Sequence, residues 1–287
     1  MNGELDEEIY LEIPPSLNMP ETPNSVLKLK KSLYGLKQSP RAWFDRFTKA
    51  VKRFGYTQSH TDHTMFIKHL VGGGRAILIV YVDDIILTGD HQEELQRLKL
   101  FLAKEFEVKD LGNLKYFLGM EIARSKIGIS VSQRKYVLDL LKETGMTGCK
   151  PAETPMDTTI KLSMQSSGAP VDKGRYQRLV GKLIYLSHTR PDISFAVSVV
   201  SQFMNCPAEG HMQAVYRILR YLKSTPSQGL FFEKTSDRYL KIFTDADWAG
   251  SPVDRRSTSG YCSFLWGNLV TWRSKKQAVV ARSSAEA

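Results

Sequence analysis

The sequence predicts an α+β fold in which a mixed region is followed by a mainly helical region and then by short strands. In the first half of the chain, apolar runs of strand length alternate with amphipathic helical patterns. Further on, the apolar spacing is helical, and after Gly229 it changes to short strands separated by turns. We therefore expect three regions and one linker rich in Pro, Thr, Ser, Met and Gly: 1–145, 146–228 and 229–287, with the linker at 146–171.

The charge distribution favours a polyanionic partner. The net charge is +10, and it is unevenly placed: residues 1–25 hold six acidic and no basic side chains, whereas residues 26–53 hold nine basic side chains and one acidic residue, Asp45. Basic side chains that contact phosphates release counterions, so nucleic acid is the favoured partner. The alternative is that these two oppositely charged segments form complementary faces that meet within the fold.

Three features bear on the compartment. Cys149, Cys206 and Cys262 are far apart and form no Cys-x-x-Cys pair, so we expect free thiols and neither a disulfide framework nor a zinc site. The N-terminus is acidic where a secretory signal needs basic and then apolar residues. The longest apolar run, residues 76–82, is too short to cross a bilayer. We therefore expect an intracellular protein, in the cytoplasm, the nucleus or an organelle.

The first region begins with a short strand at residues 10–13, followed by prolines, and then a helix. Ser39 is the expected N-cap of this helix, Pro40 lies in its first turn and Gly55 ends it. Its apolar stripe is predicted to be core and consists of Trp43, Phe47, Val51 and Phe54. Its opposite face is basic and carries Arg41, Arg46, Lys49, Lys52 and Arg53.

The remaining elements follow from the same two periodicities. Strands are expected at 65–69, 76–82, 85–87, 116–123 and 127–131, and helices at 93–106 and 132–143. The second region is predicted to contain helices at 176–187, 191–204 and 211–223. The third is predicted to contain strands at 230–233, 239–244, 261–265 and 270–272, with a tight turn at Gly267-Asn268.

The clearest chemical feature is the pair Asp83-Asp84, which lies between two apolar strands. Adjacent carboxylates in such a setting are costly unless they are neutralised. At a hairpin tip they would project together as hard oxygen ligands suited to Mg²⁺, and two such ions could activate a 3′-hydroxyl and stabilise a leaving pyrophosphate. The alternative interpretation is a polar turn whose aspartates only cap the hairpin.

Three blocks of sequence together resemble the reverse transcriptase of copia-type LTR retrotransposons. Residues 81–84 (Tyr-Val-Asp-Asp) resemble the aspartate motif of the palm. Residues 33–43 resemble the segment that supports template and incoming nucleotide, and residues 117–122 resemble the primer grip. The blocks occur in the order of that family, and the similarity continues through residues 176–181, 189–193 and 217–223.

This resemblance implies a reverse transcriptase palm remnant, a mainly helical thumb and connection, and the first strands of an RNase H-like fold. Residues 244–250 resemble the first RNase H strand, with Asp245 as a metal ligand, and residues 283–286 resemble the start of the helix that supplies Glu286. Asp247 shares a strand face with Asp245 at period two. The implied nucleic-acid and nucleotide contacts are Lys31, Lys37, Gln38, Arg41, Phe117, Leu118 and Gly119.

The implied function is RNA-directed DNA synthesis by two-metal phosphoryl transfer, with Mg²⁺, a template–primer of RNA or DNA, and deoxynucleoside triphosphates. The third palm carboxylate of the family would precede residue 1, and the later RNase H carboxylates would follow Ala287. We therefore expect an inactive chain that is truncated at both ends and prone to self-association through unpaired strand edges. The alternative is a non-catalytic nucleic-acid-binding or inert remnant of a decayed element.

Overall fold

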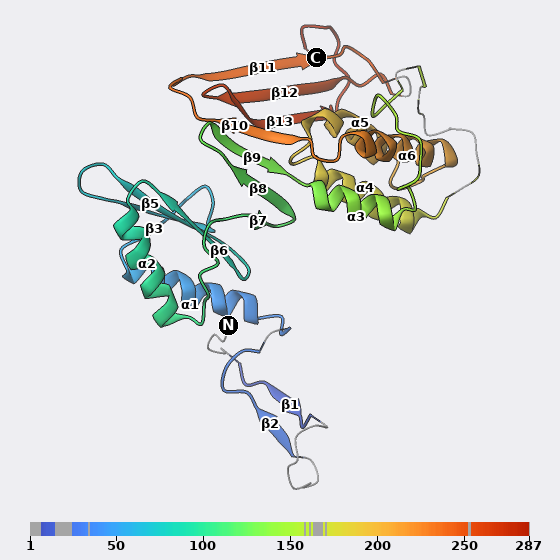
Figure 1. Ribbon diagram of the computed structural model, residues 1–287. Helices are drawn as coiled ribbons and strands as arrows, with labels where there is room; N and C mark the ends of the chain where they lie inside the picture. The colour runs from blue at the N-terminus through green and yellow to red at the C-terminus, as the bar shows by residue number, and fades with distance from the viewer. Residues whose placement is uncertain are drawn as a thin grey trace. The chain divides into compact units, whose positions relative to one another are not determined.

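The computed structural model describes residues 7–14, 25–33, 35–157, 159–160, 162, 169, 171–251 and 254–286. The chain forms two compact units, residues 1–114 and 115–287, and both combine helices with antiparallel sheets (Figure 1). The predicted α+β class is therefore confirmed. The boundary between the two units, at residue 114, differs from the predicted region boundaries at 145 and 228. Those boundaries stay predictions about which family domain each region derives from.

Unit 1 contains a two-stranded ribbon and a four-stranded antiparallel sheet with two helices. The ribbon pairs β1 (Tyr10–Glu12) with β2 (Val26–Lys28). The sheet has the strand order β3 (Thr57–Gln58), β4 (Met65–His69), β5 (Arg75–Tyr81) and β6 (Asp84–Gly89). The helices are α1 (Ser39–Arg53) and α2 (Gln92–Glu105).

Helices α1 and α2 cover one face of this sheet. Alternate side chains of β5 are buried while those between them stay half-buried, because successive strand residues point to opposite faces. Phe47 of α1 and Leu98 of α2 are fully buried and belong to the same core as Phe66 and Leu78 of the sheet. The predicted apolar stripe of α1 is thus confirmed as core. The ends of the helix match the predicted ends within two residues.

The predicted N-cap of α1 is wrong. Gln38 occupies the cap position without a side-chain cap bond, and Ser39 is already helical. The Ser39 hydroxyl donates instead to the carbonyl of Leu33 at 2.6 Å, so it fastens the preceding turn to the helix. At the other end, Gly55 adopts the left-handed conformation (φ 95°) that commonly ends helices, as predicted.

Unit 2 holds a four-stranded sheet, a helical cluster and a three-stranded sheet. The strand order of the first sheet is β10 (Gly229–Glu233), β9 (Gly128–Ser132), β8 (Met120–Arg124) and β7 (Tyr116–Phe117). The helices are α3 (Arg134–Glu143), α4 (Lys173–Leu186), η1 (Pro191–Ile193), α5 (Ser194–Ser201) and α6 (Glu209–Ser224). The second sheet has the order β11 (Leu240–Ala246), β12 (Thr258–Leu265) and β13 (Asn268–Lys276).

Two elements of unit 2 differ from the prediction. The single strand expected at 116–123 is a hairpin, because Leu118 (φ 47°) and Gly119 (φ 76°) form a two-residue turn between β7 and β8. The expected helix at 191–204 is a short 3-10 turn followed by α5. The turn at Leu118-Gly119 was missed because leucine is not a typical turn residue, so the strand pattern of the sequence runs through it without a break.

The sequence predicts that the strand at 230–233 belongs with the C-terminal strands, but in the structure this strand, β10, belongs to another sheet. It pairs antiparallel with β9, from Gly229 opposite Ser132 to Glu233 opposite Gly128. It also contacts β13, so it joins the two sheets of unit 2 (Figure 1). The strand at 229–233 is therefore structurally part of the first sheet.

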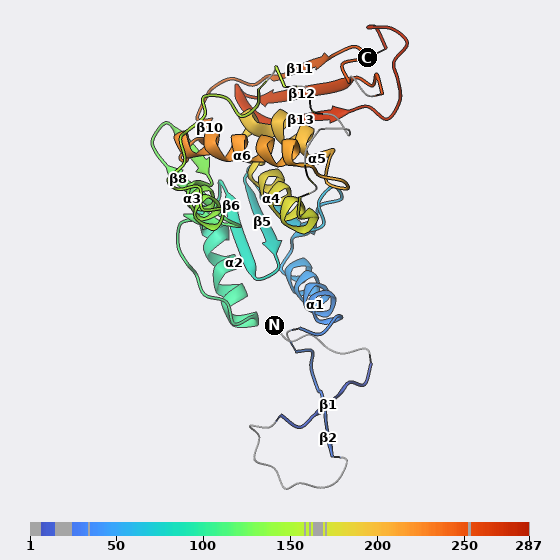
Figure 2. The ribbon, with the colours of Figure 1, turned by 90° about the vertical axis from the view of Figure 1, so that its right-hand side faces the viewer.

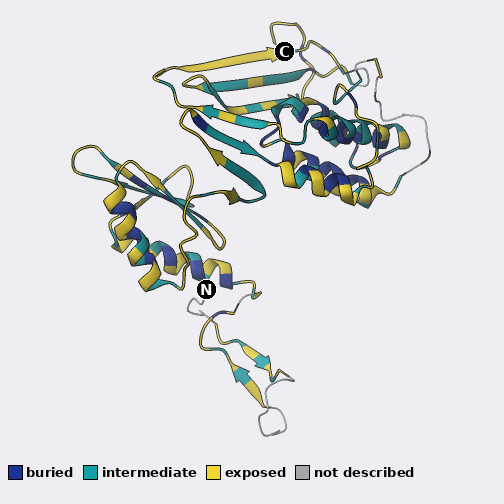
Figure 3. Cartoon of the chain, in the orientation of Figure 1, coloured by how far each residue is buried: buried dark blue, intermediate teal, exposed yellow. Residues whose placement is uncertain are grey.

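The helical cluster forms the larger core of the chain, and the three-stranded sheet is more open. Leu183 of α4, Val215 of α6 and Ile193 are fully buried. Strand β13 lies against α5 (Figure 2). The outer strand β11 is exposed along almost its whole length, as Figure 3 shows, and presents Ile242 and Phe243, each more than half exposed.

Within the described residues, no helix has the length and apolar character that a membrane crossing requires.

Candidate nucleic-acid and metal site

Asp83 and Asp84 lie at the tip of the β5–β6 hairpin. Tyr81 pairs with Asp84, so Val82 and Asp83 form the two-residue loop. Both carboxylates are exposed. The geometry agrees with the expectation that apolar flanking strands would carry the two aspartates to a hairpin tip.

The tip holds a strained residue. Val82 has φ 50° and is 60% exposed. A β-branched side chain is an outlier in this left-handed region, which glycine and asparagine tolerate better. Strain of this kind concentrates at functional sites, and it is an observation independent of the aspartates.

The described residues bring two carboxylates to this tip but form no group of three or more His, Cys, Asp or Glu side chains suited to a metal ion. Two hard oxygen ligands suit Mg²⁺, which commonly takes one or two carboxylates and fills its octahedron with water and substrate phosphates. Asp83 and Asp84 thus fit part of a magnesium site.

The basic segment predicted to contact nucleic acid lies at the start of α1. Lys31, Lys37 and Arg41 are exposed, and Gln38 is half-buried. The Gln38 amide donates to Glu7 at 2.9 Å, while Lys28 forms an ion pair with Glu8. The acidic N-terminal segment therefore contacts part of the basic segment. For Lys28, this contact supports the alternative that the two segments form complementary faces. The side chains of Lys31, Lys37 and Arg41 are exposed to solvent.

The predicted primer-grip residues Phe117, Leu118 and Gly119 form the tight turn between β7 and β8. The hydroxyl of Tyr185, from α4, donates to the carbonyl of Leu118. A side chain at Gly119 would meet that same tyrosine, at 3.6 Å from its hydroxyl. The helix α4 thus supports the turn, and sequence reasoning missed Tyr185 because its contact spans 67 residues.

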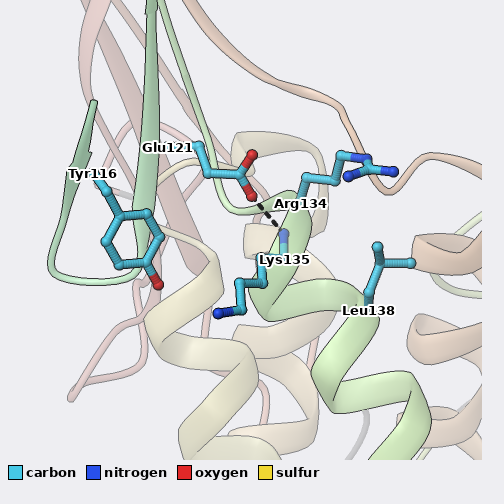
Figure 4. A pocket seen from close by; sticks show the side chains of 5 residues that line it. All are labelled: Tyr116, Glu121, Arg134, Lys135 and Leu138. Atoms are coloured by element: carbon cyan, nitrogen blue, oxygen red, sulfur yellow. Dashed lines mark hydrogen bonds between the residues drawn. The ribbon is translucent and has the colours of Figure 1, made fainter.

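Beside this hairpin lies a hollow of about 370 Å³ lined by Tyr116, Glu121, Arg134, Lys135 and Leu138 (Figure 4). Glu121 accepts a hydrogen bond from the backbone N–H of Lys135 at 2.7 Å. Its carboxylate therefore neutralises the N-terminus of α3, where an anion is favoured. The side chains of Arg134 and Lys135 give the rim of the hollow a positive charge.

The predicted RNase H residues lie in the last part of the chain. Asp245 is exposed near the end of β11, opposite Gly260. Glu286 lies in a turn and not in the helix that was expected, and its carboxylate accepts from the backbone N–H of Arg282 at 2.8 Å. Among the described residues, Asp245 and Glu286 join no acidic cluster suited to a metal.

Asp247 lies one residue beyond the strand that carries Asp245, and its carboxylate is engaged by the neighbouring strand. Strand β11 ends at Ala246, and the carboxylate of Asp247 accepts from the backbone N–H of Thr258. A side chain at Gly250 would lie 2.2 Å from Asp247, so the two residues pack closely. Asp247 therefore holds together the turn after β11.

Comparison with known proteins defines the class. Residues 1–158 match the family described as reverse transcriptase (RNA-dependent DNA polymerase). The chain is 33% identical over 290 residues to a putative transposon Ty5-1 protein of Saccharomyces cerevisiae, covering 100% of this chain and 94% of that protein. The chain therefore belongs to the reverse transcriptase family.

The more similar relatives define the subgroup. The chain is 44% identical over 287 residues to the retrovirus-related Pol polyprotein from transposon RE1 of Arabidopsis thaliana, covering 100% of this chain and 20% of that polyprotein. It is 39% identical over 296 residues to the one from transposon TNT 1-94 of Nicotiana tabacum, of which it covers 22%. The chain corresponds to a segment of a copia-type retrotransposon Pol polyprotein and spans about a fifth of these relatives. No solved structure matches it.

Proposed function

We propose that the chain is the part of an RNA-directed DNA polymerase that carries the double aspartate of the palm and binds template–primer. The observation that carries this proposal is the exposed Asp83-Asp84 pair at a strained hairpin tip, within a segment that matches the reverse transcriptase family. Bound Mg²⁺ would supply charge neutralisation for phosphoryl transfer from a deoxynucleoside triphosphate, and Asp83 and Asp84 are the residues that would hold it.

In this proposal, residues 1–145 derive from the palm, 146–228 from the thumb and connection, and 229–287 from the N-terminal part of an RNase H-like domain. Lys31, Lys37 and Arg41 contact phosphates, and Gln38 lies beside them. The turn Phe117–Gly119 contacts the primer. Asp245 and Glu286 are the ancestral RNase H carboxylates. Contacts of this type are made mainly to phosphate and sugar, so binding is salt-sensitive and tolerant of sequence.

The number of carboxylates decides between an active polymerase and a binding protein. A cooperating set of catalytic groups loses most of its rate when one member is absent. The described residues gather two acidic ligands at the hairpin tip and no group of three. We therefore propose that the chain by itself binds template–primer and does not extend it.

The test combines primer extension with binding. Purified chain is incubated with an RNA template, a labelled DNA primer, deoxynucleoside triphosphates and Mg²⁺, beside Asp83→Asn and the matched control Asp139→Asn, whose exposed carboxylate lies on α3. We expect no extension by any of the three proteins. Extension that is lost in Asp83→Asn and kept in Asp139→Asn would show an active polymerase.

Binding is measured by anisotropy of the same template–primer at several salt concentrations. The double variant Lys37→Gln/Arg41→Gln should weaken binding and lower the salt dependence, with Lys104→Gln, an exposed lysine of α2, as the matched control. Equal affinity and equal salt dependence in the three proteins would overturn the assignment of this segment as a nucleic-acid contact.

A further inference from the structure

A second hollow lies where the two sheets of unit 2 meet. Its volume is about 510 Å³, within the size range of small-ligand sites. Three elements form its wall: the turn between β8 and β9, the end of β10, and the turn between β12 and β13. Its lining includes Arg124, Lys126, Glu233, Lys234, Trp266 and Asn268.

The wall is held together by the side chain of Asn268 and by one backbone hydrogen bond. The side-chain oxygen Oδ1 of Asn268 accepts from the backbone N–H of Glu233 at 2.6 Å. Its side-chain nitrogen Nδ2 donates to the backbone carbonyl of Glu233 at 3.0 Å. The backbone N–H of Lys234 donates to Ile127 at 2.8 Å. The three elements are therefore joined by hydrogen bonds, and the hollow is part of the fold.

Trp266 is displayed on this wall in a strained conformation. Together with Gly267 it forms the two-residue turn between β12 and β13, and both have positive φ, 54° and 78°. Asn and Gly favour such turns, and a bulky aromatic residue does not. The residue is nonetheless 43% exposed. A large aromatic ring held at a loop tip against its backbone preference suggests a binding role.

The charges around the indole select an anionic occupant. Arg124, Lys126 and Lys234 contribute three positive charges to the lining and Glu233 one negative charge, which leaves +2. Arg238 places its guanidinium 4.7 Å from the centre of the Trp266 ring but does not itself line the hollow. Trp266 lines the hollow and Arg238 does not, so the hollow is open to the indole beside this cation–π contact.

We propose that this hollow binds single-stranded nucleic acid, with one base stacked on Trp266 and the adjoining phosphates near Arg124, Lys126 and Lys234. Aromatic rings that stack bases, combined with cations that follow the backbone, are the usual means of sequence-tolerant single-strand binding. The site is separate from the Asp83-Asp84 hairpin, and it does not require polymerisation.

The test uses the full chain and a labelled oligothymidylate, followed by anisotropy and by quenching of tryptophan fluorescence. Trp266→Asn removes the ring and places at this position a residue that tolerates positive φ, so the turn should fold at least as well. We expect roughly 5- to 100-fold weaker binding, the loss typical of one stacked base. Trp266→Phe should weaken binding less, because it keeps an aromatic ring.

Trp248→Phe is the matched control, since Trp248 is exposed and its indole N–H donates to Ala281 outside the hollow. It should leave the affinity and most of the quenching unchanged. The triple variant Arg124→Gln/Lys126→Gln/Lys234→Gln should lower the slope of log affinity against log salt by about 2, at about 0.7 per lost phosphate contact on a single strand.

The same comparison is repeated in the Lys37→Gln/Arg41→Gln background, so that binding by unit 1 does not conceal the effect. The loss caused by Trp266→Asn should be the same in both backgrounds. Unchanged affinity in Trp266→Asn, quenching that persists in this variant, or equal binding of heparin and oligothymidylate would each overturn the proposal. The last result would indicate a general polyanion surface, and absence of oligonucleotide binding would also overturn the proposal.

Discussion

The buried ion pair between Arg190 and Asp192 should decide the stability of the helical cluster. The Arg190 side chain is only 1% exposed and Asp192 is 23% exposed, and their closest atoms are 2.7 Å apart. Arg190 also donates to the carbonyl and the hydroxyl of Thr225, both at 2.8 Å, and Tyr221 donates to Asp192 at 2.8 Å. The network ties η1 to the C-terminal end of α6.

Removing one partner leaves the other charge buried. Asp192→Ala should therefore destabilise unit 2 by about 3–5 kcal/mol, the usual cost of breaking a buried pair. We expect the lower end of that range, because Asp192 retains some contact with water. The double variant Arg190→Met/Asp192→Ala removes both charges, so its cost should be at least about 1 kcal/mol less than the sum of the two single costs.

The assay is amide hydrogen exchange of α6, with α2 of unit 1 as an internal reference. This readout suits a chain with two units, where a single unfolding transition is not assured. About 3 kcal/mol corresponds to roughly 100-fold faster exchange in α6. Arg178→Met, which changes an exposed arginine of α4, is the matched control and should have little effect. Additive effects of the two single variants would refute the reasoning.

The same pair predicts a dependence on pH. Burial raises the pKa of Asp192, but the hydrogen bonds from Arg190 and Tyr221 and the charge of Arg190 outweigh it, so the pKa lies below its usual value. A lowered pKa means that the stabilisation is present above the unfolded value, about 4, and is lost as the pH falls through the folded one. Protection of α6 should therefore decrease below about pH 4, and this component should be absent in Asp192→Ala.

Three further predictions concern single side chains, each measured by amide hydrogen exchange in the unit that holds the side chain. Val82→Asn should raise stability by about 1 kcal/mol, because asparagine tolerates the positive φ of this exposed position better. A loss of stability would mean that the packing of the valine side chain outweighs its backbone strain. Glu94→Gln should cost about 1–3 kcal/mol, because Glu94 is buried and lies 2.7 Å from Lys68; unchanged hydrogen exchange in α2 would contradict this. Glu121→Ala should cost about 1 kcal/mol and increase exchange only in the first turn of α3, where the carboxylate caps Lys135.

Local periodicity predicted most of the elements, and long-range contacts supplied what it missed. The apolar strands around Asp83 and Asp84 were sufficient to place the aspartates at a hairpin tip. The turn at Leu118 could not be predicted, because leucine gives no local turn signal and its hydrogen-bond partner Tyr185 lies 67 residues away. Arg190 gave no local sign of burial, since arginine is usually exposed and its partner Thr225, at the end of α6, lies 35 residues away.

The candidate site shows the same division. The basic residues at the start of α1 could be identified from local charge, and they are exposed as expected. Trp266 could not be identified, because its significance depends on the conformation of a turn and on cations contributed by β8 to β10.

The pairing of β10 with β9 limits how segments of such polyproteins can be exchanged in evolution. If a recombination joint, the point where sequences from two elements meet, fell before Gly229, the edge strand β10 of the first sheet would come from the other element. Ser132 and Gly128 of β9 would then pair with residues from that element. A joint between Lys234 and Tyr239 would leave that sheet intact and transfer β11, β12 and β13 together. Recombinants among related elements should therefore accumulate joints in this short interval, and the contact of Asn268 with Glu233 should constrain which pairs remain compatible.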